Sequence, residues 1–211
     1  RLLIFITLPA MAGLILLSKP IVFLLFERGQ FGSHSTVMVA QTIVAYATGL
    51  WAYAGLRVIV PAFYSLQDTK TPVKVGAFTL LINLVCAFTL MHFFQHLGLA
   101  LATAIASAVN CLLLLALLKR RLGDTIKLTG LYRAFSQTIL ATVIMIAVVL
   151  GLDLIPLITP DYNSHLHECL RLILKIAAAL GVYFMCAKIM HSPELQELQQ
   201  LVSRRRRKSQ S

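Results

Sequence analysis

Six apolar segments, each long enough to cross a bilayer, constrain this chain more than any other feature. They cover approximately residues 2–26, 36–63, 74–94, 97–118, 132–152 and 167–190. A helix needs about 20 apolar residues to cross the hydrocarbon core of a membrane. Only helices and closed barrels satisfy all backbone polar groups there. The sequence therefore predicts an all-α polytopic membrane protein with six transmembrane helices.

Composition supports this class, because 58% of the residues are hydrophobic and only 13% are charged. Soluble domains carry roughly 25% charged residues. In the first segment, Pro20 can break the helix and leave a short interfacial helix up to Phe26. The chain opens at Arg1 without a cleavage site, so the first segment is not read as a signal peptide. We expect the C-terminal portion of a longer protein.

The basic residues are distributed very unequally between the two sides of the expected membrane. If the six segments alternate and the tail is cytoplasmic, 14 of the 19 basic residues face one side, and only Lys19 and Arg28 face the other. The fourteen are Arg1, Lys70, Lys74, Lys119, Arg120, Arg121, Lys127, Arg133, Lys188, Arg204, Arg205, Arg206, Arg207 and Lys208. By the positive-inside rule, both ends are expected to be cytoplasmic. Loops near 27–35, 92–97 and 153–166 then face the opposite, periplasmic side.

The net charge of +11 does not indicate a nucleic-acid partner, because the charge follows the membrane topology. The run Arg204–Lys208 is too short to bind nucleic acid alone. It is expected to contact anionic lipid headgroups, at about 1 kcal/mol per basic residue.

Motifs for catalysis, metal binding or a cofactor do not occur in the sequence. The four cysteines fall within or at the ends of the apolar segments and resemble packing residues. His92 and His96 have helical spacing but no third ligand nearby in the sequence. No carboxylate lies deep in any segment, so no catalytic residue, metal site, cofactor or proton relay is predicted.

One arginine, Arg57, lies inside the second apolar segment. A charge within a span costs several kcal/mol, and Pro61 removes the N–H that would bond the carbonyl of residue 57. At 100° per residue, an arc of about 80° holds Thr42, Tyr46, Gly49, Tyr53, Arg57 and Tyr64. This stripe suggests a cavity wall whose cation meets an anionic substrate. Alternatively Arg57 snorkels, since it lies only ~10 Å along the helix from Tyr64.

Weaker candidates occur in the third and fourth segments. Thr103, Ser107 and Asn110 form a polar stripe among small residues, which favours helix packing over substrate contact. Asn83 has the same two interpretations.

The sixth segment places Arg171 and Lys175 on one face, with Glu168 one turn before Arg171. The simpler interpretation is an ion pair between Glu168 and Arg171. The sharper interpretation is an outward-facing anion site.

The chain is expected to divide into four parts. Residues 1–121 hold four helices of a transporter lobe, and 122–131 form a cytoplasmic linker. Residues 132–192 form an appended helix pair, and 193–211 form a basic cytoplasmic tail. No internal repeat is recognised.

Three stretches resemble a known family: Leu25–Phe31, Arg57–Lys74 and Gly98–Thr103. The first two contain the loop residues Glu27, Arg28, Gly29, Asp68, Thr69, Lys70, Thr71 and Pro72. Together they resemble the MurJ/MviN family of lipid II flippases, within the multidrug/oligosaccharidyl-lipid/polysaccharide exporter superfamily. The resemblance covers nearly the whole chain and is strongest up to about residue 121.

The resemblance implies two six-helix lobes plus a final helix pair, of which this chain supplies the last six helices. The implied substrate is the undecaprenyl-pyrophosphate-linked peptidoglycan precursor, turned across the bacterial inner membrane by alternating access. Arg57 matches a position that is basic in the family, and the final pair is associated with a lipid-tail groove. No covalent chemistry, and so no enzyme activity, is implied. Because the third segment lacks a carboxylate, an acidic ion site is not expected.

Other functions remain as alternatives. A related exporter of other lipid-linked sugars or of drugs would share the fold. A membrane enzyme using polyprenyl-phosphate donors would need a loop carboxylate pair or a metal motif. A structural membrane subunit is disfavoured only by the stripe around Arg57.

Overall fold

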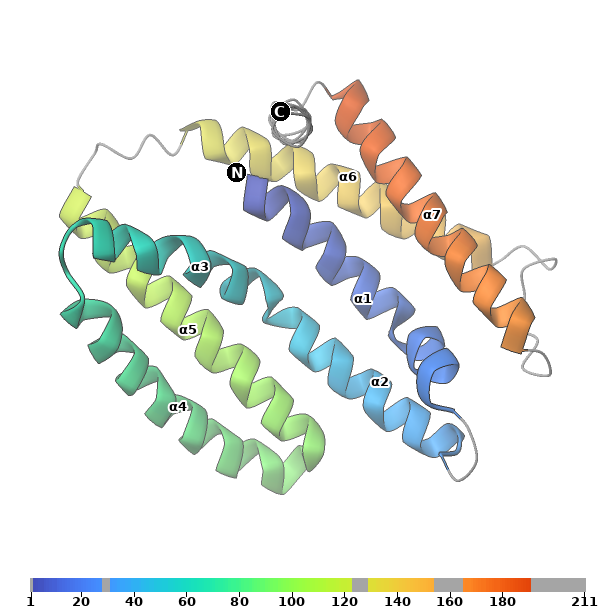
Figure 1. Ribbon diagram of the computed structural model, residues 1–211, viewed down its shortest axis with the longest axis horizontal. Helices are drawn as coiled ribbons and strands as arrows, with labels where there is room; N and C mark the ends of the chain where they lie inside the picture. The colour runs from blue at the N-terminus through green and yellow to red at the C-terminus, as the bar shows by residue number, and fades with distance from the viewer. Residues whose placement is uncertain (1, 28–30, 123–128, 154–164, 191–211) are drawn as a thin grey trace, which may run out of the picture. The chain divides into compact units, whose positions relative to one another are not determined.

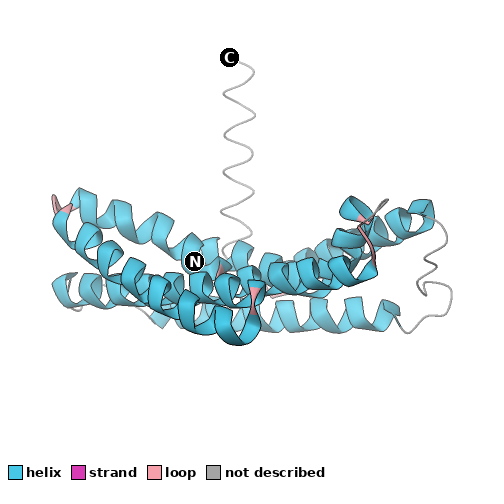
Figure 2. Ribbon diagram, turned by 90° about the horizontal axis from the view of Figure 1, so that it is seen from below, coloured by secondary structure: helices cyan, strands magenta, loops and turns pink. Residues whose placement is uncertain are grey.

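The computed structural model describes residues 2–27, 31–122, 129–153 and 165–190, and these residues are almost entirely helical (Figures 1 and 2). The helices are α1 (Leu2–Phe26), α2 (Ser33–Thr48), α3 (Leu50–Ser65), α4 (Lys70–Phe94), α5 (His96–Leu122), α6 (Thr129–Asp153) and α7 (His165–Ile189). No strand occurs within these ranges. The predicted all-α class is confirmed.

Six helical stretches in the described ranges are long and apolar enough to cross a membrane. They are Leu2–Phe26, Ser33–Ser65, Lys70–Phe94, His96–Leu122, Phe135–Leu152 and Glu168–Ile189. Each coincides with one predicted apolar segment, and α2 and α3 together form the second. Six predicted spans are therefore confirmed by length and composition.

The chain forms two compact units. One, the α6–α7 unit, comprises Arg1–Gly13 and Leu128–Ser211; the other, the α5 unit, comprises Leu14–Lys127. Helix α1 thus contributes its first half to one unit and its second half to the other. The four-part division expected from the sequence stays a prediction, and its basic tail lies outside the described residues.

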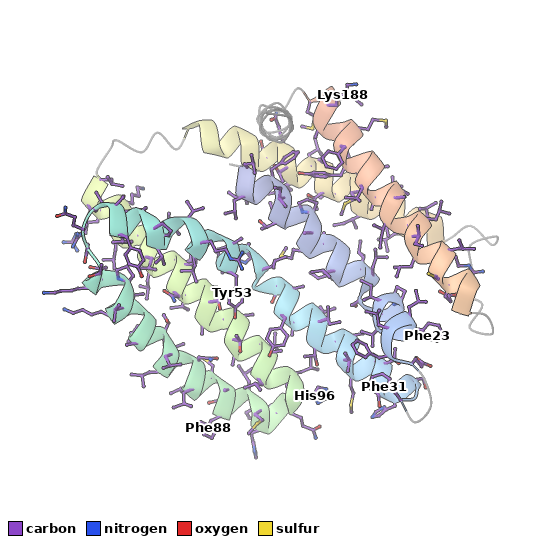
Figure 3. The ribbon with its side chains drawn as sticks, viewed as in Figure 1. Phe23, Phe31, Tyr53, Phe88, His96 and Lys188 are labelled. Carbon is purple, nitrogen blue, oxygen red and sulfur yellow. The ribbon has the colours of Figure 1, made fainter. Side chains whose placement is uncertain are left out.

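Proline does not end α1, which is helical without interruption from Leu2 to Phe26. Its last turns, which include Phe23, run in a different direction from the turns before them (Figures 1 and 3). Pro20 explains this bend, because proline inside a helix removes one hydrogen bond and crowds the preceding turn. The separate interfacial helix expected from the sequence is thus a bent continuation of α1.

Helices α4 and α5 form a tight antiparallel hairpin. Gln95 is the one residue between them, and its φ of 51° reverses the chain. Gly98 follows, and a Cβ at this position would collide with the backbone of Leu90 and Met91. Glycine is therefore required where α5 begins against the end of α4.

Helix α5 is the centre of its unit and packs against α2, α3 and α4. A core cluster on α3 and α5 comprises Ala52, Ile59, Phe63, Cys111, Leu114 and Leu118. A Cβ at Gly49 would lie 3.0 Å from the Cα of Ala104, and one at Gly55 would lie 2.6 Å from the Sγ of Cys111. The small residues of α5 thus permit close helix packing, as predicted.

The second span has a break at Gly49, between α2 and α3, which the sequence analysis did not predict. The Gly49 N–H donates to the Tyr46 carbonyl at 3.0 Å, and the Ala52 N–H donates to the Gly49 carbonyl at 3.0 Å. These three-residue hydrogen bonds tighten the helix locally, as in a 3₁₀ turn. The break falls where the backbone of α5 lies close to it at Ala104.

In the α6–α7 unit, α6 and α7 pack side by side (Figure 1). The Tyr183 hydroxyl of α7 donates to the Phe5 carbonyl at 2.6 Å, and the two rings lie 5.1 Å apart. Pro9 stands four residues after Phe5, so the N–H that would ordinarily bond that carbonyl is missing. Tyr183 therefore supplies the hydrogen bond that Pro9 removes.

Candidate functional site

Arg57 lies on α3 and is exposed. It makes no ion pair or side-chain hydrogen bond with any residue that the structure describes. Tyr46, Tyr53 and Tyr64 from the predicted stripe are also exposed. We call these four residues the tyrosine–arginine face (Tyr53 is labelled in Figure 3).

Packing against α5 explains why these side chains face outward. The residues of α2 and α3 that are buried include Ala45, Ala52, Ile59 and Phe63. Since α5 covers that side of both helices, the polar and aromatic residues of the other side remain uncovered.

Two other residues of the stripe do not belong to the exposed face. Gly49 is buried against Ala104 and serves packing. Thr42 is half-buried, and its hydroxyl donates to the Met38 carbonyl at 2.9 Å. The stripe predicted from helical geometry is thus reduced, in this structure, to three tyrosines and Arg57.

Pro61 lies inside α3, which continues through it. It removes the N–H that would bond the carbonyl of residue 57. No side chain of the described residues donates to that carbonyl. The carbonyl of residue 57 therefore lacks its ordinary helical donor, and the Arg57 side chain has no ion-pair or hydrogen-bond partner in the described ranges.

A cavity of about 420 Å³ lies elsewhere in the α5 unit, between α1, α2 and α5. Its lining is mostly apolar and comprises Ser18, Lys19, Val37, Ala40, Gln41, Val44, Ala45, Thr48, Leu97 and Leu101. None of the tyrosine–arginine face lines it, so the predicted cavity wall around Arg57 stays a prediction.

In the first motif loop, the carboxylate of Glu27 links the end of α1 to the start of α2. The Thr36 hydroxyl, buried in the first turns of α2, donates to Glu27 Oε2 at 2.5 Å. Glu27 thereby fixes the end of α1 against the start of α2, where a negative charge also suits the helix dipole. Arg28 and Gly29 lie outside the described residues.

The second motif loop caps α4. Asp68 accepts hydrogen bonds from the Thr71 N–H at 3.0 Å and from the Thr71 hydroxyl at 2.6 Å. Thr69 flanks the helix and Lys70 begins it, while Pro72 is buried in the first turn, where no N–H is needed. The hydrogen bonds from Thr71 hold the pKa of Asp68 below its ordinary value.

Asp68 also forms an ion pair at 2.7 Å with Arg121, at the far end of α5. No local sequence pattern predicts this contact, because the two residues are far apart in the chain. The sequence did contain one indication of the pair. Asp68 and Arg121 have opposite charges and lie at segment ends that meet if α4 and α5 form a hairpin. Both motif loops thus have clear structural roles at helix ends.

The weaker candidates on α4 and α5 behave mainly as packing residues. Thr103 donates to the Leu99 carbonyl at 2.9 Å, and Ser107 donates to the Thr103 carbonyl at 2.8 Å. The side-chain oxygens of Asn83 and Asn110 are buried without a hydrogen-bond partner. No substrate role for Thr103 or Asn83 follows from these contacts.

On α7, Arg171 forms the predicted ion pair with Glu168 at 3.0 Å. Their side chains are 19% and 8% exposed. Lys175 lies one turn further along and is half-buried. The ion-pair interpretation of Arg171 is confirmed, and the anion site stays a prediction. Among the described residues, no group of three or more His, Cys, Asp or Glu side chains could hold a metal ion.

This architecture defines a polytopic helical membrane protein with close-packed hairpins and an exposed intramembrane arginine. The family model described as "Lipid II flippase MurJ" matches residues 1–166, and the chain belongs to this family. The resemblance noted in the sequence is therefore confirmed.

Curated relatives and a solved structure agree. The chain is 35% identical over 185 residues to a probable lipid II flippase MurJ of Rhizobium meliloti (strain 1021), covering 87% of this chain and 34% of the relative. It is 30% identical over 137 residues to the lipid II flippase MurJ of Burkholderia cenocepacia, and the match covers 65% of this chain and 26% of that relative. The solved structure "Lipid II flippase MurJ, inward closed conformation" matches with a TM-score of 0.75 and 27% identity. The match covers 89% of this chain and 36% of that structure's chain. The chain thus spans about a third or less of these proteins.

Proposed function

We propose that this chain works as part of a lipid II flippase of the bacterial inner membrane. The substrate would be lipid II, the undecaprenyl-pyrophosphate-linked precursor of peptidoglycan, turned from the inner to the outer leaflet. The observation that carries the proposal is the family match over residues 1–166, which the fold match to a MurJ structure supports. In this proposal the C-terminus is cytoplasmic, because the side of the membrane that carries most of the basic residues is expected to face the cytoplasm.

The mechanism is alternating access, in which rigid helical lobes rock about a substrate site. Small-residue packing of α5 against α2, α3 and α4 supports a rigid body, because closely packed helices move together. The substrate is moved and not chemically changed, so no enzyme activity and no cofactor take part.

Arg57 is proposed to pair with the pyrophosphate of lipid II. A guanidinium binds phosphate oxygens through two parallel N–H donors, which favours arginine over lysine at such a site. Its support is the exposed side chain without an ion-pair partner in the described ranges. The tyrosines beside it offer hydroxyl donors, and the polyprenyl tail remains in lipid.

Complementation tests the function. Cells depleted of their own lipid II flippase should be rescued by the full-length gene, and labelled lipid II should reach their outer leaflet. Residues 1–211 alone should fail, even when they accumulate in the membrane to the same level. Failure of the full-length gene at normal membrane levels would contradict the proposed substrate, and rescue by residues 1–211 would contradict the need for further helices.

A further inference from the structure

Helix α4 has an unusually uncovered outer surface. Only 6% of its membrane-length window is buried in the described structure, against 17% or more in each of the other five spans. At 100° per residue, five exposed residues share an arc of about 80° with Lys70. They are Lys74, Phe78, Leu81, Val85 and Phe88. Figure 3 shows Phe88 on the side of α4 away from α5. We call this set of six the α4 stripe.

The stripe is apolar along the helix and basic at one end only. Lys70 and Lys74 occupy the first two turns, and the large apolar side chains follow through three further turns. A surface with this gradient is not typical of a helix face exposed only to water or of one buried in a protein core. Its basic end matches the change from headgroup to acyl chain at one surface of a bilayer, and its apolar part continues across the hydrocarbon core.

The end of α5 adds further cations at the same place. The ion pair between Asp68 and Arg121, at 2.7 Å, holds the start of α4 beside the last turn of α5. That turn also carries Lys119 and Arg120, both exposed. Four cations, two on each helix, therefore belong to the two helix ends that the ion pair of Asp68 and Arg121 joins.

Those four cations have no ion-pair partner in the described ranges. Lys70, Lys74, Lys119 and Arg120 form no ion pair or side-chain hydrogen bond there. Asp68 is engaged by both Thr71 and Arg121. This end of the hairpin therefore carries an excess of positive charge, which attracts anions at a membrane surface.

We propose that the α4 stripe and the adjoining end of α5 bind one anionic phospholipid. The phosphate headgroup lies among Lys70, Lys74, Lys119 and Arg120, and an acyl chain lies along the stripe. Basic residues near a membrane surface each contribute about 1 kcal/mol of attraction to anionic lipid, or about five-fold in binding. This site does not depend on lipid II transport and would persist if the chain moved another substrate.

Photo-crosslinking tests the site in the full-length protein. p-Benzoylphenylalanine replaces Phe78, and the protein is reconstituted in vesicles of equal phosphatidylglycerol and phosphatidylcholine. Mass spectrometry of the crosslinked product gives the ratio of the two lipids. We expect an excess of phosphatidylglycerol over phosphatidylcholine that falls toward equal labelling, by up to about five-fold for each charge lost in Lys70→Gln and Lys74→Gln.

A matched control uses the same probe in place of Phe184 on α7, one turn from Lys188, the one exposed Lys or Arg among the described side chains of that helix. There Lys188→Gln should change the lipid ratio less than the paired α4 substitutions do. A second variant, Lys119→Gln with Arg120→Gln, should lower the ratio at position 78 without altering the stripe itself.

Three results would overturn the proposal. Equal crosslinking of both lipids at position 78 would show an ordinary lipid boundary. Crosslinking to protein would show that another helix covers α4. Displacement of phosphatidylglycerol by a small amount of added lipid II would assign the surface to the transported substrate.

Discussion

Two prolines, one in each compact unit, free a helical carbonyl with opposite consequences. In the α6–α7 unit, Pro9 frees the carbonyl of Phe5, and the Tyr183 hydroxyl donates to it at 2.6 Å. In the α5 unit, Pro61 frees the carbonyl of Arg57, and no side chain in the described ranges donates to it. A side chain therefore replaces the missing helical donor in one unit, and no described side chain does so in the other.

The intramembrane cations differ in the same way. Arg171 of α7 pairs with Glu168 at 3.0 Å, whereas Arg57 is exposed without such a partner. An unsatisfied polar group in hydrocarbon costs several kcal/mol. Polar groups of α7 therefore stabilise their own unit, while those around Arg57 require water, headgroups or substrate. The comparison separates a structural arginine from a candidate for substrate binding.

The largest expected effect is on transport, through Arg57→Ala. We expect loss of rescue in flippase-depleted cells with normal membrane levels, because the pyrophosphate loses its cation. Arg57→Lys should keep part of the activity, since lysine retains the charge but not the two-donor geometry. Both variants are made in the full-length gene, with membrane levels measured in parallel. A well-accumulated, fully active Arg57→Ala would mean that Arg57 merely snorkels.

Arg171→Ala should act on stability instead. Its loss leaves the Glu168 carboxylate, 8% exposed, without this ion pair. Breaking a buried pair costs about 3–5 kcal/mol, and partial exposure of Arg171 places this case near the lower value. Urea unfolding of the full-length protein in detergent measures the loss. The double variant Glu168→Gln with Arg171→Gln should recover most of it, and Arg57→Ala should show none.

Equal destabilisation by Arg57→Ala and Arg171→Ala would erase the difference between the two arginines. Both arginines would then be structural, and the proposed binding of substrate at the tyrosine–arginine face would lose its support.

The units also differ in how closely their backbones approach. A Cβ at Gly98 collides with Leu90, whereas nothing lies within 4 Å of a Cβ at Gly181 on α7. Gly98→Ala should therefore cost about 1–3 kcal/mol through overpacking. Gly181→Ala should be neutral or stabilise by up to about 1 kcal/mol through helix propensity. Thermal unfolding in detergent compares the two, and similar shifts would contradict the close α4–α5 approach.

Sequence predicted the features that arise from local periodicity. The six spans follow from apolar length, and the ion pair of Glu168 and Arg171 follows from three-residue spacing on a helix. The common face of Arg57, Tyr53 and Tyr64 followed from helical geometry, although Gly49 proved to pack against Ala104.

Features that join distant parts of the chain were not predictable in this way. Asp68 and Arg121 are brought together only by the hairpin of α4 and α5. Tyr183 and Phe5 meet only when α7 packs beside the start of α1. A single sequence has no period that links such residues, so their partners depend on tertiary structure.

The smallest expected effect concerns the carbonyl that Pro9 frees. Tyr183→Phe removes the hydroxyl that donates to the Phe5 carbonyl and should cost about 1 kcal/mol. Pro9→Ala restores a backbone N–H at position 9, which can bond the same carbonyl within the helix. In that background Tyr183→Phe should cost clearly less. A double-mutant cycle by urea unfolding of the full-length protein measures the coupling. No coupling would mean that the hydroxyl does not replace the missing helical hydrogen bond, and the contrast with Pro61 would lose its basis.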